Sequence, residues 1–120
     1  MIELLNDVAS NVAGFRAKGK VTKEDYEHVV VPEVEKKLAS AGKIHFLLYL
    51  DTDVGNYTAG AWLEDGLIGL KHFTKWHKMA IVSDQESVRK FTDIFSFISP
   101  GEAKGFTKDE YQEAKTWVAN

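Results

Sequence analysis

The sequence predicts an α/β protein with a mixed, mostly parallel sheet covered by helices. Short apolar runs typical of buried strands alternate with longer stretches in which apolar residues recur at helical spacing. Several of the helical stretches begin with a hydroxyl residue that is followed three positions later by an acid, the pattern of a capping box. The predicted element order is β-β-α-β-α-β-α-β-α, and we expect a single domain over residues 1–120.

The first part of the chain predicts two antiparallel strands and a helix. Residues 2–5 are a short apolar run, and residues 12–19 alternate in part, which predicts a half-buried strand. Thr22 can cap the helix that follows, and Gly42 is well placed to end it. Pro32 has no amide hydrogen, so the helix must kink or restart near it.

The middle of the chain predicts the central strand and a glycine-rich helix. Residues 43–51 are almost continuously apolar, as expected of a strand covered on both faces. The predicted helix 58–73 contains Gly60, Gly66 and Gly69. Each interior glycine costs roughly 1 kcal/mol relative to alanine, which suggests that something packs close to the helix backbone.

Two further strand–helix pairs complete the order. Residues 79–82 predict a buried strand, and residues 83–86 form a capping box for the third helix, which ends at 99–101. Residues 102–106 predict a short edge strand, and a capping box at 107–110 opens the last helix.

Composition excludes several classes of function. The chain has no cysteine, which excludes disulfides and thiolate metal sites and fits a reducing compartment. A net charge of −3 argues against nucleic-acid binding. The longest apolar run, residues 44–50, is far shorter than the roughly 20 residues of a membrane span. No signal-peptide pattern precedes it, so we expect a cytoplasmic protein.

The crossing from the central strand into the next helix is the first candidate site, because ligands in open α/β sheets gather beyond the carboxyl ends of strands. Thr58 would cap this helix. Unlike the other three helix starts, it has an alanine, Ala61, three residues on in place of an acid. Thr58 is therefore either a plain cap or a position for anion binding or phosphorylation.

An excess of aromatic residues gives the second candidate. A cleft between the second and third helices could bind an apolar ligand. The residues that would contact this ligand are Tyr57, Thr58, Trp62, Phe91 and Phe95. The alternative is core packing together with a homodimer contact.

A basic and aromatic segment follows the second helix. Lys71, Lys75, Trp76 and Lys78 could contact an anionic membrane surface, with the indole at headgroup depth. The alternative is a helix C-terminus with favourable cations and a solvated loop.

No catalytic or metal-binding motif stands out. His72 and His77 are five residues apart rather than four, and no Ser-His-Asp order is recognisable. We expect neither a metal nor a cofactor, and no enzymatic activity.

Several stretches resemble one family across nearly the whole chain. They are Gly14-Phe15-Arg16, Gly19-Lys20-Val21-Thr22-Lys23-Glu24-Asp25-Tyr26, Val31-Pro32, Tyr57-Thr58-Ala59-Gly60-Ala61-Trp62-Leu63-Glu64-Asp65 and Phe97-Ile98-Ser99-Pro100-Gly101-Glu102. This pattern resembles the SpoIIAA-like family of small bacterial proteins, which has a STAS-type fold. The family is similar to anti-sigma-factor antagonists, and it shares features with CRAL-TRIO lipid-binding domains.

The resemblance implies ligand binding and membrane association rather than catalysis. Our leading hypothesis is a non-enzymatic module that binds a lipid-like or other apolar molecule, in part at a membrane surface. The alternative is a signalling protein that a regulatory partner switches by phosphorylation at Thr58, which matches the phosphorylated serine of the antagonists. The antagonists carry an Asp-Ser-Ser-Gly-type sequence, whereas this chain has Asn56-Tyr57-Thr58-Ala59-Gly60.

Overall fold

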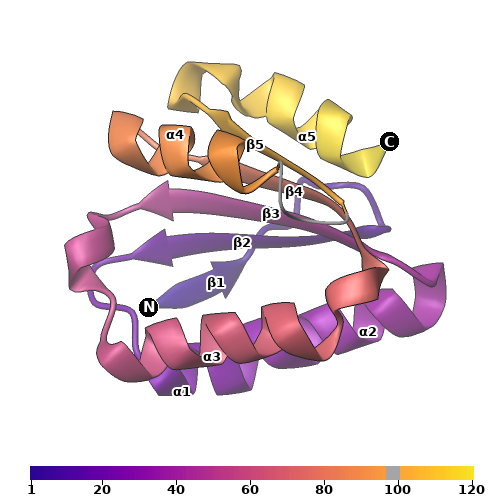
Figure 1. Cartoon of the computed structure of the whole chain (residues 1–120), viewed down its shortest axis with the longest axis horizontal. Helices are drawn as coiled ribbons and strands as arrows, with labels where there is room; N and C mark the ends of the chain where they lie inside the picture. The colour runs from indigo at the N-terminus through magenta and orange to yellow at the C-terminus, as the bar shows by residue number, and fades with distance from the viewer. Residues whose placement is uncertain (97–100) are drawn as a thin grey trace.

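Five strands form one mixed sheet in the computed structural model, which describes residues 1–96 and 101–120 and only the backbone of residues 68–70, 91, 94 and 95. The strands lie side by side in chain order (Figure 1). They are β1 (Ile2–Leu4), β2 (Val12–Lys18), β3 (Ile44–Asp51), β4 (Trp76–Val82) and β5 (Glu102–Phe106). β1 pairs antiparallel with β2, and all the other pairs are parallel.

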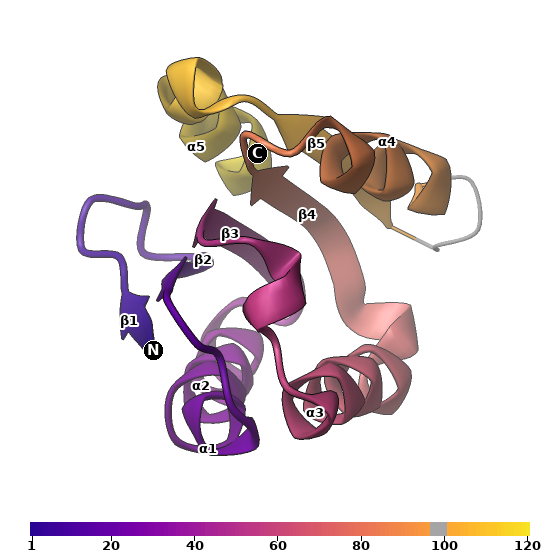
Figure 2. The ribbon, with the colours of Figure 1, turned by 90° about the vertical axis from the view of Figure 1, so that its left-hand side faces the viewer.

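Helices cover both faces of the sheet. They are α1 (Lys23–Asp25), α2 (Val31–Ala41), α3 (Ala59–Lys71), α4 (Glu86–Phe95) and α5 (Tyr111–Ala119). A π-helical segment, Tyr26–Val30, joins α1 to α2. Short 3₁₀ turns over residues 54–56, 73–75 and 108–110 precede α3, β4 and α5. Figure 2 shows α1, α2 and α3 on one side of the sheet and α5 on the other.

The core has two layers that the sheet separates. The larger layer lies between the sheet and α2 and α3, and Val88 of α4 packs against it, so α4 shares this face. The smaller layer lies under α5 and includes Leu47, Phe106 and Val118. Because side chains of a strand point alternately to opposite faces, β3 supplies both layers. This explains its almost continuous apolar sequence.

The predicted fold and element order are confirmed. Thr22 forms a capping box with Asp25, and the helix changes from π to α geometry immediately before Pro32. Gly42 ends α2 with a φ of 79°, a left-handed conformation that glycine adopts without strain. The capping box at Thr107 is also present, before the short 3₁₀ turn that leads into α5.

Four details of the prediction are wrong. The first half of β2 is buried on both faces rather than half-buried, because Leu5 and Val8 of the preceding connection cover the face away from α2, whereas Arg16 and Lys18 stay partly exposed. β4 begins at Trp76, three residues earlier than expected. α3 ends at Lys71, because the chain then tightens into a 3₁₀ turn. α4 begins only at Glu86, since the Ser83 hydroxyl accepts a hydrogen bond from the Gln85 amide in a turn before the helix.

Candidate functional site

The crossing between β3 and α3 is tied to two neighbouring segments. The Val21 amide donates to the Asn56 carbonyl, and the Thr58 amide donates back to the Val21 carbonyl at 2.9 Å. On the other side, the Gln85 side chain accepts from the Val54 amide at 3.0 Å and donates to the Asp53 carboxylate. These contacts fix the path of the chain into α3.

Thr58 is half-buried and acts as the N-cap of α3. Its hydroxyl accepts a hydrogen bond from the Ala61 amide at 3.1 Å. The first turn of α3 contains no acid, so the helix dipole there faces no carboxylate of its own helix. The predicted close approach to the α3 backbone is found at Gly60, where an added Cβ would lie 3.0 Å from the Lys23 Cβ. Gly66 has open space around it, and Gly69 lies outside the described side chains.

Asp51, at the end of β3, is held by two cations. Its carboxylate accepts from the Arg16 guanidinium at 2.6 Å and from the Lys108 ammonium at 2.8 Å. Lys108 also forms an ion pair with Asp84 at 3.2 Å. The hydrogen bonds from Lys108 and then Arg16 lower the pKa of Asp51 to about 2. Asp51 therefore links the last part of β2 and the end of β3 to the 3₁₀ turn that follows β5.

A polar and aromatic cluster lies beneath the start of α3. The Tyr57 ring lies 4.9 Å from the Trp62 ring and 6.1 Å from the Tyr26 ring. The buried Tyr26 hydroxyl donates to the Asp65 carboxyl at 3.0 Å, and burial raises the pKa of Asp65. Burial also raises the pKa of Tyr57 to about 12. Within the described parts of the chain, the Tyr57 hydroxyl has no partner in hydrogen-bond geometry. The nearby Tyr26 hydroxyl opposes the rise in the pKa of Tyr57 but is not placed to satisfy its hydroxyl.

The structure brings together only part of the predicted ligand site. Tyr57, Thr58 and Trp62 are neighbours, but Tyr57 is buried whereas Trp62 is 51% exposed. The side chains of Phe91 and Phe95 lie outside the described residues. The structure therefore describes no cleft between α3 and α4.

The outer side of α3 carries an apolar surface that the sequence analysis did not single out. We call it the α3 apolar face: Trp62, Leu63 and Leu67 on the helix, with Phe73 just beyond its end. The exposed fractions of Leu63 and Leu67 are 61% and 49%. The sequence did carry a signal for this face, because α3 has apolar residues around more of its circumference than one buried stripe requires.

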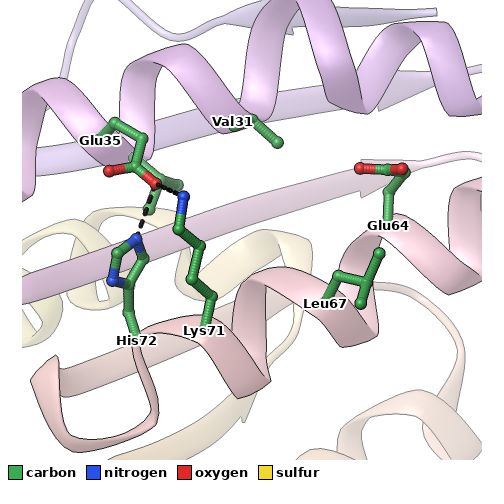
Figure 3. Close-up of a pocket in the computed structure, with 7 residues that line it drawn as sticks. Val31, Glu35, Glu64, Leu67, Lys71 and His72 are labelled. Carbon is green, nitrogen blue, oxygen red and sulfur yellow. Dashed lines mark hydrogen bonds and ion pairs between the residues drawn. The ribbon is translucent and has the colours of Figure 1, made fainter.

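A cavity of about 170 Å³ lies between α2 and α3, next to the α3 apolar face. Its lining combines apolar and charged side chains, as Figure 3 shows. Those residues are Val31, Val34, Glu35, Glu64, Leu67, Lys71 and His72. At one end, Glu35 lies 2.7 Å from the His72 ring and 3.3 Å from the Lys71 ammonium, and the hydrogen bond from His72 lowers the pKa of Glu35. Glu35 and His72 are far apart in the chain, so no local motif reveals this pair.

The predicted membrane-contact set does not form one surface. Lys71 and Lys75 are exposed near the end of α3. Trp76 instead packs in the core, its ring 5.5 Å from that of Phe46. Lys78 lies on the opposite face of the sheet, where it donates to the Trp117 carbonyl of α5 at 3.1 Å. Regular alternation would place Trp76 and Lys78 on the same face. The register of β4 against β3 shifts between these two residues, and this irregularity directs their side chains to opposite faces.

The described residues include neither a candidate membrane span nor a cluster of metal ligands. No helix there is long and apolar enough to cross a membrane. Nor does that part of the chain group three or more His, Cys, Asp or Glu side chains in a way that could hold a metal ion.

Comparisons with known proteins agree with the observed topology. Residues 12–119 match the SpoIIAA-like family. Among solved structures, an uncharacterised protein from Shewanella loihica PV-4, of the DUF3478 family with a SpoIIAA-like fold, is similar at 28% identity and a TM-score of 0.69. The similarity covers 98% of this chain and 93% of that one. No curated protein matches the sequence. The match over almost the whole length shows that the chain belongs to the SpoIIAA-like family.

Proposed function

We propose that this protein is a non-enzymatic binding module that associates with amphipathic, lipid-like molecules and with membrane surfaces through α3. The observation that carries the proposal is the α3 apolar face. A surface helix normally turns its apolar residues toward the core, whereas here Trp62, Leu63 and Leu67 are each about half exposed or more. Contiguous exposed apolar surface of this kind is typical of interaction sites.

The surroundings of this face support an amphipathic ligand. Leu67 belongs both to the α3 apolar face and to the cavity between α2 and α3. The cavity offers Val31 and Val34 to an apolar chain, and the Glu35–His72–Lys71 group to a polar end. Lys71 and Lys75, both exposed, would face anionic headgroups if α3 lay along a membrane.

The chemistry of the cavity supports binding rather than catalysis. The Glu35 carboxylate is engaged by both His72 and Lys71. These contacts lower the pKa of Glu35, so its carboxylate is a weak proton acceptor. Domains of the SpoIIAA-like and STAS type are generally non-enzymatic, which agrees with this interpretation.

Vesicle flotation tests the proposal. Wild-type protein should float with phosphatidylcholine vesicles, and more strongly when phosphatidylglycerol is included. Burying a leucine contributes roughly 2 kcal/mol, so the double variant Leu63→Ser/Leu67→Ser should bind at least tenfold more weakly. Leu4→Ser is the matched control, because Leu4 on β1 is 52% exposed and lies away from α3.

A second double variant tests the contribution of the two lysines to binding of anionic vesicles. Lys71→Gln/Lys75→Gln should reduce binding only to vesicles that contain phosphatidylglycerol, since each lysine near an anionic surface contributes about 1 kcal/mol. If wild-type protein binds neither vesicle type, and native mass spectrometry finds no lipid in the purified protein, the proposal is wrong.

A second candidate function is a switch at Thr58. Its support is electrostatic: the first turn of α3 has no acid, and the Lys23 side chain packs over Gly60 in that turn. A phosphate on Thr58 would therefore meet free amides and a cation, and it would also change the surface that a regulatory partner contacts. Capture of partner proteins should differ between wild type, Thr58→Ala and Thr58→Glu. Identical capture by all three would contradict the switch.

A further inference from the structure

The two edges of the sheet are treated differently. At the β5 edge, side chains from α4 and from the residue after it accept hydrogen bonds from the backbone amides that point away from the sheet. The Gly105 amide donates to the Asp93 carboxylate at 2.9 Å, and the Ala103 amide donates to the Ser96 hydroxyl at 3.1 Å. Protection of this kind prevents another chain from adding to the edge.

The β1 edge is open. The Leu5 amide donates to the Gly14 carbonyl, and the Lys18 amide donates to the Met1 carbonyl, so the odd-numbered residues of this segment face β2. In an antiparallel pair, the residues between them point their N–H and C=O groups the other way. Ile2 and Leu4 therefore direct their backbone groups outward, where no strand in the described parts of the chain pairs with them.

A groove runs beside this open edge. It has a volume of about 430 Å³ and lies between β1 on one side and the π-helical segment and the first turns of α2 on the other. Leu4, Val29 and Pro32 give it apolar surface. Leu4 is 52% exposed although it points to the same face of the sheet as the buried Ile2. The groove thus offers backbone partners on one wall and an apolar contact on the other.

We infer that the β1 edge and this groove, together the β1 groove, bind an extended peptide segment of a partner protein by strand addition. In this mode, backbone hydrogen bonds to an edge strand provide affinity, and alternate side chains of the peptide enter a neighbouring pocket. The groove lining carries both signs of charge, with Glu3 and Glu33 as well as Lys36. The peptide is therefore recognised by its backbone and an apolar side chain rather than by a strong charge.

The size of the edge favours a peptide over a second copy of the chain. β1 has only three residues. A symmetric contact limited to this strand would pair three residues of each copy, which is little surface beside the roughly 1,200 Å² that a stable interface buries, whereas a single extended segment needs little more than the edge and the groove. This inference is independent of the lipid-binding proposal, since it uses a different face of the protein.

Substitutions of Leu4 separate the contribution of its backbone amide to peptide binding from that of its side chain. Leu4→Ala removes the apolar side chain and keeps the outward amide. Leu4→Pro removes the amide as well, and the β1–β2 ladder does not use that amide. Heptapeptides selected from a random display library on wild-type protein should bind Leu4→Pro roughly tenfold more weakly than Leu4→Ala. The selected sequences should share an apolar residue at alternate positions.

Amide hydrogen exchange gives a second readout that needs no variant. In free wild-type protein, the Leu4 amide should exchange fast and the Leu5 amide slowly. A selected peptide should slow exchange at Leu4. The inference is overturned if no peptide is enriched, if the selected peptides bind Leu4→Ala and Leu4→Pro equally, or if exchange at Leu4 slows with protein concentration alone. The last result would place a second copy of the chain at the edge.

Discussion

Tyr26 and Tyr57 permit a test in which the same chemical change should have opposite effects. Both are buried, with 1% and 9% of their surface exposed. The Tyr26 hydroxyl donates to Asp65, whereas the Tyr57 hydroxyl has no partner in the described residues. Replacing either tyrosine by phenylalanine removes one oxygen atom and leaves the ring in place.

The expected magnitudes follow from this difference in hydrogen bonding. A buried polar group without a partner costs about 1–3 kcal/mol, so Tyr57→Phe should raise the free energy of unfolding by about 1 kcal/mol and the melting temperature by about 4 °C. Tyr26→Phe should lower the free energy of unfolding by about 2 kcal/mol, because the partly buried Asp65 carboxyl then loses its donor.

The pH dependence of Tyr26→Phe provides a further check. Burial raises the pKa of Asp65 above 3.8, and the hydrogen bond from Tyr26 opposes that rise. Below pH 3.8 the carboxyl is neutral in both the folded and unfolded states, so the variant loses only a neutral hydrogen bond. As the pH rises through the folded pKa, the wild type stabilises the ionised form and the variant does not, so the cost grows.

Urea unfolding followed by circular dichroism, at pH 3.5 and pH 7.5, measures these changes in both variants. The reasoning is refuted if Tyr57→Phe destabilises the protein by more than about 0.5 kcal/mol, since that would show that its hydroxyl has a partner. It is also refuted if the cost of Tyr26→Phe is independent of pH.

Two other predictions concern the strand ends and the glycines. The ion pairs of Asp51 lower its pKa from 3.8 to about 2, so the stability that they contribute is present above pH 3.8 and is lost as the pH falls toward 2. Because the Asp51 side chain is 31% exposed, solvent screening limits this contribution to about 1 kcal/mol. Lys108→Gln should flatten that acid transition in urea unfolding, and an unchanged acid transition would contradict the assignment. Gly105→Ala should lower the melting temperature by at least 10 °C, because the added Cβ would lie 2.6 Å from the Arg89 Cα. Gly66→Ala in α3 has free space around the added Cβ and should raise the free energy of unfolding by up to about 1 kcal/mol. Equal melting temperatures for the two alanine variants would contradict the packing described here.

The fold was predictable because its signals are local. Apolar runs, capping boxes and the pair of Pro32 and Gly42 each act within a few residues, and together they define the element order. These local signals do not determine how far each face of an element is buried by the rest of the chain. The alternating pattern of residues 12–19 suggests one exposed face, but β2 lies between two strands, and the connection that precedes it covers the first half of that face.

The site was less predictable because its parts come from distant segments. The crossing at Thr58 and its cap follow from sequence spacing. The Glu35–His72 pair joins two helices, and no short motif encodes it. Trp76 illustrates the opposite error. A basic and aromatic run looks like one surface patch, yet a strand begins within it, and a register shift at its start sends Trp76 and Lys78 to opposite faces.

α3 shows why packing alone does not account for this sequence. Its inner side includes Asp65, a carboxyl that burial disfavours in its charged form, and its outer side includes Leu63 and Leu67. Exchanging the two kinds of residue would improve both the core and the solubility of the surface. A helix that places an acid inside and leucines outside is therefore better explained by a partner for its outer face than by the stability of the domain. The flotation experiment with Leu63→Ser/Leu67→Ser addresses this directly, because those substitutions should leave stability nearly unchanged while removing vesicle binding.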